Sequence, residues 1–241
     1  MDSLSIAAAS GLRSRLQSLD LLANNLANTG TAGFKRDTEY YGVFQSDQAE
    51  GEQALPMVQR QWTDFSQGTL QVTSDPMDIA LSGSGFLVVK GPSGPLYTRN
   101  GNLQTQSNGT LTTAEGYPLL DTKGNPIILQ PNQPVTIGSD GSITQDGQPV
   151  GQLQIVQFPN PQLLNKLGSA CFQNTDAKNV PTAATNVQVQ QGKLEGSNVP
   201  VAESAMHLVG LMRQFEMLQK AVGISSEMDT KSIQEVARVG G

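Results

Sequence analysis

The chain has 241 residues, which is enough for one large domain or two smaller ones with a buried core. Only 15% of the residues are charged and the net charge is −6, which argues against a nucleic-acid-binding protein and against a protein that binds an acidic membrane surface. One Cys and one His exclude an internal disulfide framework and a Cys- or His-rich metal cluster.

The first segment, residues 1–34, is predicted to be helical because its apolar residues alternate at intervals of three and four, as in a heptad repeat. The seam consists of Leu12, Leu16, Leu19, Ala23 and Leu26. Gly33 lies just beyond it and suits a left-handed cap or turn. Residues 1–11 contain no Lys or Arg and no sustained apolar run, so no cleaved secretory signal is predicted.

A connecting segment, residues 35–75, leads into a middle domain, residues 76–190, that reads as β. The apolar run Phe86–Val89 lies between glycine-containing turns, and hairpin signals such as Asn100-Gly101 recur along the domain. Frequent turn signals without helical periodicity predict an antiparallel sandwich or barrel-like domain.

The last segment, residues 191–241, returns to helical spacing, with a helix expected from about residue 200 to 236. Its seam includes Leu208, Leu211, Phe215, Leu218 and Val222. Isolated helices of this length are marginal in water, so each apolar stripe needs a partner. We therefore expect an α+β fold in which the two terminal helices pair as a coiled-coil-like stalk flanking the β domain. The alternative is that they order only when neighbouring copies supply the apolar surface.

The residues offer little support for catalysis. His207 lies beside a seam position of the last helix, and a lone Cys171 is more often a small core residue than a nucleophile. No Gly-rich segment has the spacing of a phosphate-binding or dinucleotide-binding loop. We expect no enzyme activity, no cofactor, no metal, no small-molecule substrate and no nucleic-acid partner.

Three groups of motifs lie in order along the chain. The first is Asn24–Thr29 with Gly33-Phe34-Lys35, the second is Pro76–Val89 with Tyr97–Leu103, and the third is Gln191–Val199 with Arg213–Met217. Together they resemble the signatures of the flagellar axial proteins, specifically the basal-body rod protein family shared by the rod and the hook. The resemblance covers essentially the whole chain. It is strongest to the proximal-rod type, and next to the distal-rod type.

The resemblance implies a structural subunit of the flagellar basal-body rod, a tubular drive shaft that spans the periplasm and transmits torque. Implied partners are other rod and hook subunits, copies of the chain itself and the flagellar export apparatus, which exports such chains without a cleaved signal. A rival hypothesis from the residues alone is an extracellular β-domain binding or adhesion module.

Besides the two seams, seven further residues are candidates for assembly contacts: Asn24, Asn25, Asn28, Gly33, Phe34, Glu195 and Asn198. The three asparagines are expected either to hydrogen-bond across subunits or to cap the end of their own helix. Glu195 and Asn198 are expected to make polar contacts, and sequence does not decide whether these lie within or between subunits.

Overall fold

The computed structural model describes residues 3–44, 55–131, 133–168 and 170–239, and the chain divides into two units. Unit 1 contains residues 1–27, 37–62 and 200–241, and unit 2 contains residues 28–36 and 63–199. The chain therefore crosses from one unit to the other after residues 27, 36, 62 and 199.

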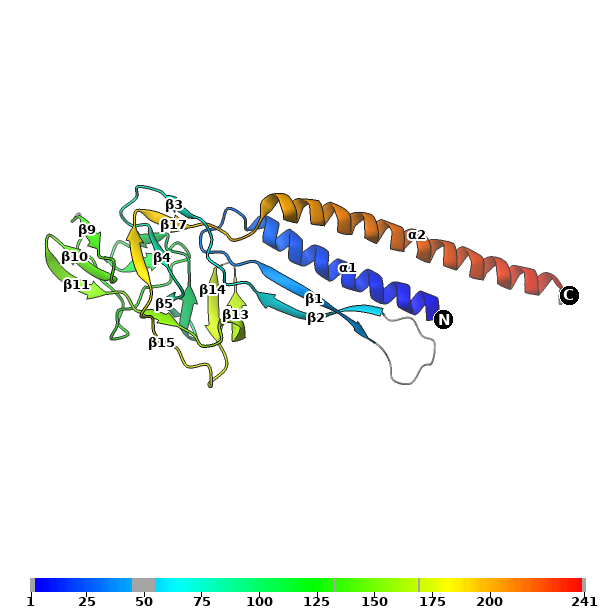
Figure 1. Cartoon of the computed structure of the whole chain (residues 1–241), viewed down its shortest axis with the longest axis horizontal. Coiled ribbons are helices and arrows are strands. Elements are labelled where there is room, and N and C mark those ends of the chain that lie inside the picture. The colour runs from blue at the N-terminus through cyan, green and yellow to red at the C-terminus, as the bar shows by residue number, and fades with distance from the viewer. Residues whose placement is uncertain (1–2, 45–54, 132, 169, 240–241) are drawn as a thin grey trace. The chain divides into compact units, whose positions relative to one another are not determined.

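Unit 1 is built from two helices and a two-stranded sheet (Figure 1). The helices are α1 (Ser3–Ala27) and α2 (Val201–Val239), and the sheet pairs β1 (Asp37–Phe44) with β2 (Leu55–Thr63). The two helices lie side by side, and Gly11 of α1 leaves room for Leu218 of α2, whose Cδ1 would be 3.8 Å from an added Cβ. Among the described residues, neither helix is long and apolar enough to cross a membrane.

The predicted α+β fold with a coiled-coil-like stalk is wrong. The face that α1 buries consists of Ser14, Ser18, Leu22 and Asn25, whereas the predicted seam residue Leu16 is 47% exposed. The physical reason is a second neighbour: α1 also contacts β1, so the buried face is turned away from the leucine repeat. The described chain is mostly β, with seventeen strands against two α-helices.

The largest sheet of unit 2 has six antiparallel strands in the order β13-β14-β6-β5-β12-β15. Their bounds are β5 Phe86–Gly91, β6 Gly94–Thr98, β12 Ile155–Gln157, β13 Leu164–Leu167, β14 Cys171–Asn174 and β15 Thr182–Ala183. A tight turn joins the central strands β5 and β6. In the ladder that these two strands form, Leu87 lies opposite Thr98 and Gly91 lies opposite Gly94. Gly94 has a φ of 136°, a conformation that suits glycine.

Smaller antiparallel sheets surround this one. A three-stranded sheet has the order β11-β10-β9, with β9 Val135–Ile137, β10 Ser142–Gln145 and β11 Gln148–Gln152. Two-stranded pairs join β4 (Ile79–Ser82) to β16 (Gln188–Gln191), β3 (Leu70–Val72) to β17 (Lys193–Glu195), and β7 (Leu103–Thr105) to β8 (Leu111–Thr113). A short 3₁₀ helix, η1 (Pro161–Leu163), precedes β13. The pairs β3–β17 and β4–β16 bring residues 70–82 next to residues 188–195, near the two ends of the long segment of unit 2.

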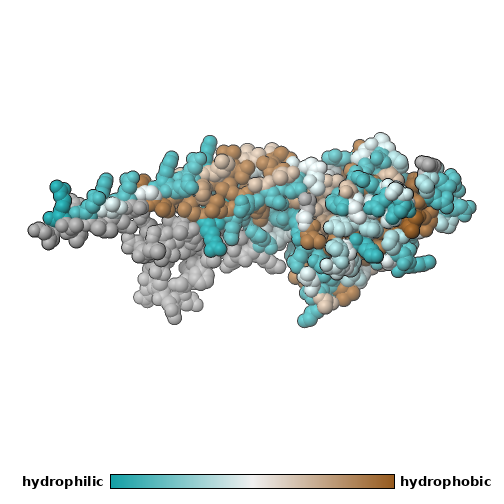
Figure 2. Space-filling model, turned by 180° about the vertical axis from the view of Figure 1, so that it is seen from behind, coloured by the Kyte–Doolittle hydropathy of each residue, from teal (hydrophilic) through white to brown (hydrophobic). Residues whose placement is uncertain are grey.

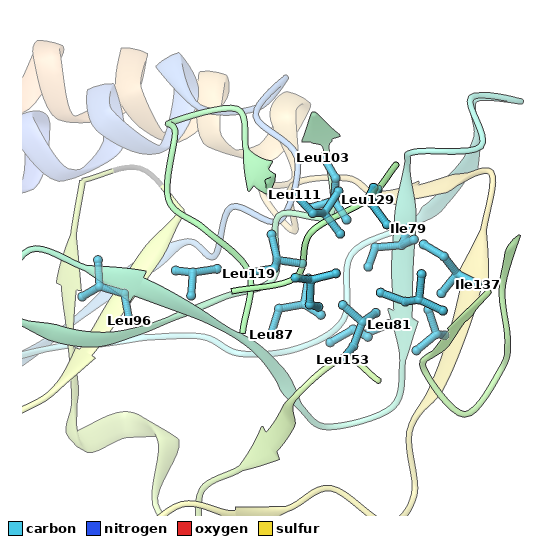
Figure 3. Packing of buried hydrophobic residues seen from close by; sticks show 14 of the residues in the cluster. Ile79, Leu81, Leu87, Leu96, Leu103, Leu111, Leu119, Leu129, Ile137 and Leu153 are labelled. Carbon is cyan, nitrogen blue, oxygen red and sulfur yellow. The ribbon is translucent and has the colours of Figure 1, made fainter. Parts of the chain in front are cut away.

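Strand β5 separates two hydrophobic clusters, which explains its unbroken apolar run. Because successive side chains of a strand point to opposite faces, Leu87 and Val89 join an aliphatic cluster, and Phe86 and Val88 join an aromatic one. Figure 3 shows the aliphatic cluster, to which Leu81, Leu119 and Leu153 contribute from segments well separated in sequence. Unit 2 therefore has a substantial core of its own.

Candidate assembly site

Three charged side chains meet in the interior of unit 2, and we call Lys35, Arg99 and Glu195 the buried charge cluster. Lys35 and Glu195 are fully buried and Arg99 is 4% exposed. The Lys35 Nζ lies 2.5 Å from Glu195 Oε1, and Arg99 Nη1 lies 3.4 Å from Glu195 Oε2. One carboxylate thus stands between two cations. Because an uncompensated buried charge is costly, removing one member of such a group typically destabilises a protein by about 3–5 kcal/mol.

Backbone groups complete the surroundings of Lys35 and Glu195. The Lys35 ammonium donates a hydrogen bond to the Ser66 carbonyl at 2.6 Å, and the Gly68 N–H donates to Glu195 Oε1 at 2.9 Å. Burial lowers the pKa of the Lys35 ammonium, even though the attraction of Glu195 favours the charged form. Glu195 therefore ties the segment before β3 to the segment that follows α1.

Arg99 is held by the β-sheets as well as by Glu195. Its Nη1 donates to the Leu81 carbonyl at 3.2 Å and its Nη2 donates to the Gly83 carbonyl at 2.6 Å. The guanidinium carbon lies 5.8 Å from the centre of the Phe86 ring, within the range of a cation–π contact. Burial lowers the pKa of this guanidinium. These contacts anchor the charge cluster to the middle of unit 2.

Asn198 makes a second bridge close to Glu195 in the sequence. Its Oδ1 accepts a hydrogen bond from the Arg36 N–H at 2.7 Å, and its Nδ2 donates to the carbonyls of Asp64 at 2.8 Å and Ser66 at 3.1 Å. Its own N–H donates to the Phe34 carbonyl at 3.4 Å. One side chain thus connects three segments of the chain.

Gly33 and Phe34 occupy tightly enclosed positions. Gly33 has a φ of 69° and donates its N–H to the Glu195 carbonyl at 2.7 Å, and a Cβ there would lie 2.3 Å from the Asn100 nitrogen. The Phe34 ring is fully buried, with the Lys166 Nζ 3.8 Å from its centre. Only glycine fits at the first position without moving backbone atoms.

These contacts bring parts of all three groups of sequence motifs together within unit 2. We call residues 28–36, 63–68 and 195–199 the exit segments, because the chain enters or leaves unit 2 through them. The predicted site residues Gly33, Phe34, Glu195 and Asn198 all lie in these segments. Sequence reasoning missed Lys35 and Arg99, although both were in the quoted motifs. The sequence feature that could have identified them is a charged residue within a motif in a chain that has few charges.

The asparagines near the end of α1 have bonding partners within their own chain. Asn25 donates from Nδ2 to the Asp37 carbonyl at 2.8 Å and accepts from the Asp37 N–H at 3.0 Å. Asn28 Oδ1 accepts a hydrogen bond from the Thr31 hydroxyl at 3.1 Å, a contact between two side chains just after the end of α1. Asn24 is exposed.

The predicted helix seams are covered unevenly. In α1, Leu12, Leu19 and Leu26 are half-buried, and Leu16 and Ala23 are exposed. In α2, Leu211 is buried, and the seam residues around it are half-buried, namely Leu208, Phe215, Leu218 and Val222.

The exposed side of α2 carries six large apolar side chains interspersed with Arg213 and Lys220, and we call these six the outer face of α2. Its members are 50–71% exposed: Met206, Val209, Met212, Met217, Ile224 and Met228. Figure 2 shows apolar surface gathered over the helices of unit 1. Exposed apolar side chains that gather on one surface commonly mark an interaction site.

Neither the one cysteine nor any group of possible metal ligands has an environment that suits catalysis. Cys171 is buried in β14, and burial raises the pKa of its thiol to about 11, which is the reverse of what a nucleophile needs. Within the described parts of the chain, no group of His, Cys, Asp or Glu side chains is placed to hold a metal ion.

Comparison with known proteins agrees with the motifs. Residues 80–145 match the family model described as flagellar hook protein FlgE/F/G D1 domain, and residues 190–235 match the model described as flagellar basal body rod FlgEFG protein C-terminal. The chain is 30% identical to the flagellar basal-body rod protein FlgF of Caulobacter vibrioides over 92% of each chain. It belongs to the flagellar basal-body rod protein family.

Relatives named FlgG match this rod protein at similar identity. It is 32% identical to the flagellar basal-body rod protein FlgG of Buchnera aphidicola, over 93% of this chain and 96% of the relative, and 30% identical to FlgG of Borreliella burgdorferi, over 92% and 94%. The predicted family is thereby confirmed. The protein is a structural, non-enzymatic component of the flagellar basal body that assembles with other axial components.

The family matches contain only some of the residues that make these contacts in this rod protein. The first matched region includes Arg99, and the second includes Glu195 and Asn198 together with most of α2. Lys35, which completes the charge cluster, lies outside both regions. Its partner role therefore follows from the geometry and not from the matched regions.

Proposed function

We propose that this rod protein is a subunit of the proximal-rod type. The supporting observation is the length of the alignments. The alignment with FlgF of Caulobacter vibrioides covers 92% of this chain in 227 positions, whereas that with FlgG of Buchnera aphidicola needs 253 positions to cover 93% of it. Since the whole chain has 241 residues, FlgG carries residues that this chain lacks.

The outer face of α2 is proposed to be buried by neighbouring axial subunits, including copies of this chain. Each fully buried Met, Val or Ile side chain contributes roughly 1.5–3 kcal/mol, so a few such residues are enough to favour association. The exposed seam residues Leu16 and Ala23 of α1 are proposed to take part in the same contacts. The small number of charges limits repulsion between copies that are packed closely.

Delivery to the rod is proposed to use the flagellar export apparatus without removal of a signal peptide. The support is the similarity of the chain to flagellar basal-body rod proteins. The assembled subunit is proposed to lie in the part of the rod that crosses the periplasm. Edman sequencing of the chain recovered from assembled flagella tests this, and an N-terminus missing a segment of signal-peptide length contradicts it.

Mass spectrometry of purified hook–basal-body particles tests the proposed subtype. The ratio of this chain to the hook subunit is measured with isotope-labelled peptides from both proteins. A few copies per particle support the proximal-rod type, and tens of copies support the distal-rod type, for which the FlgG relatives are the supporting observation. Absence of the chain from intact particles contradicts both.

A second measurement tests the outer face directly. Met217→Gln and Ile224→Gln are introduced together, with Glu216→Gln as the control on the same exposed part of the helix. The double variant is expected to reach the particles at less than about a tenth of the wild-type amount, because the change removes apolar burial from the contact. Incorporation at the wild-type level contradicts the proposed contact.

A further inference from the structure

The buried charge cluster is assembled from residues far apart in the sequence. Lys35 comes directly after the turn that ends α1, Arg99 follows β6, and Glu195 is the last residue of β17. In a chain without Glu195 in place, two cations would face each other in the interior of unit 2. Such a site is strongly unfavourable, because both charges lose water and neither gains a counter-charge.

Glu195 is placed by strand pairing and not by the charges alone. In the β17–β3 ladder, Lys193 lies opposite Val72 and Glu195 opposite Leu70, and the Gly196 N–H donates to the Thr69 carbonyl at 2.9 Å. A Cβ on Gly68 would lie 2.0 Å from the Gly196 carbonyl oxygen, so the two backbones pass in close contact. The carboxylate therefore reaches its site only when β17 has added to β3.

The hydrophobic clusters of unit 2 do not have this requirement. The aromatic cluster is formed by residues between Phe86 and Phe172, with Phe65 packed against it. The aliphatic cluster lies between Ile79 and Cys171 apart from Val189. Neither cluster includes a residue of 193–199. The core of unit 2 can therefore form from earlier parts of the chain, whereas the exit segments cannot be joined until residue 195 is present.

We propose that Glu195 is the closing residue of unit 2, whose arrival neutralises Lys35 and Arg99 together and thereby docks residues 28–36 onto the folded core. Because a chain is made from its N-terminus, Lys35 and Arg99 precede their counter-ion by a long stretch of sequence. Unit 2 accordingly folds in two steps: the core forms first, and the exit segments then close around Glu195.

Hydrogen exchange of the full-length Glu195→Gln variant tests the proposal. The Asp64 N–H reports the closing of the exit segments 28–36 and 63–68 on each other, because it donates to the Arg36 carbonyl at 2.9 Å. The Leu119 N–H, which donates to the Leu111 carbonyl at 2.9 Å, reports the core. We expect exchange at Asp64 to be at least about tenfold faster than in the wild type and exchange at Leu119 to change by less than about twofold. Glu216→Gln is the control for removing an exposed carboxylate.

A rescue experiment separates charge from general damage. Lys35→Met added to Glu195→Gln removes one of the two cations while keeping a side chain of similar length. We expect exchange at Asp64 to return to within about threefold of the wild type. If Glu195→Gln fails to fold, recovery of a folded chain by Lys35→Met is the expected result. A double variant no better than Glu195→Gln overturns the proposal, and so does equal acceleration at Asp64 and Leu119.

The folding order is tested by pulse-labelled hydrogen exchange during refolding of the full chain. Protection of the Leu119 amide is expected first, and protection of Asp64 is expected together with that of Gly196, whose N–H bonds to Thr69. Protection of Asp64 before Gly196 would show that docking does not wait for the C-terminal segment, and would overturn the proposal.

Discussion

Unit 1 and unit 2 treat their apolar residues in opposite ways. Unit 2 packs them into two clusters around β5, and its charged motif residues are buried with partners. In unit 1, α2 leaves one apolar face uncovered, and α1 buries two serines while Leu16 stays exposed. Unit 2 therefore has two buried clusters of its own, although Val72, Ile128 and Val180 are exposed, whereas α2 of unit 1 exposes apolar side chains along its length.

Core truncation is expected to give the largest effect on stability. Leu119→Ala removes a fully buried side chain from the aliphatic cluster and is expected to lower the free energy of unfolding by about 3–4 kcal/mol. Leu211→Ala, at a buried position of α2 that belongs to neither cluster, is expected to cost less, about 2 kcal/mol. Urea unfolding measures both, and an equal or reversed order contradicts the difference between the units.

Gly33→Ala sharpens the comparison at the exit segments. The new Cβ would lie 2.3 Å from the Asn100 nitrogen, and the backbone has a φ of 69°, so a loss of about 2–4 kcal/mol is expected. Gly124→Ala is the matched control, because its φ is 81° and its Cβ would have open space. It is expected to cost only about 1–2 kcal/mol. Similar losses in thermal unfolding would mean that backbone conformation and not the close approach matters at Gly33.

Because the thiol of Cys171 in unit 2 is buried, we expect the free energy of unfolding to depend on pH. Burial raises the pKa of Cys171 from 9.0 to about 11, so between these values the unfolded chain releases a proton that the folded chain retains. Stability is therefore expected to fall as the pH rises from 9 towards 11. Cys171→Ala should show a smaller fall over this range, and urea titrations at pH 8, 9 and 10 measure the difference. An identical pH dependence in both proteins contradicts the burial argument.

Substitutions on the outer face of α2 are expected to have the smallest effect on stability. Met217→Gln should change the free energy of unfolding of the isolated chain by no more than about 0.5 kcal/mol, because the side chain is already 62% exposed. Thermal unfolding of the dilute chain measures this, with Leu119→Ala as the contrasting variant. A loss as large as that of Leu119→Ala would mean that the outer face is covered within the chain.

The local sequence predicted the two helices, several hairpin turns and the family, but the predicted hairpin at Asn100-Gly101 is wrong, because β6 and β7 on either side of it lie in different sheets. Heptad spacing marks a helix because it depends only on the chain's own periodicity, and the ordered motifs are linear features. The strand at Phe86–Val89 could also be predicted from the sequence, since an unbroken apolar run suits a strand covered on both faces. Periodicity alone did not show which face of α1 is buried, because that depends on neighbours the sequence does not specify.

Tertiary structure decided what the motif residues do. Glu195 and Lys35 are 160 positions apart, and no local pattern in the sequence indicates that these two charges form an ion pair. The same is true of Asn198, which is 162 positions from Arg36 and 134 from Asp64 in the sequence but hydrogen-bonds to both. Local sequence thus determined which segments form helices and strands, whereas the pairing of β17 with β3 decided which charges meet, because long-range contacts are set by the packing of the whole unit.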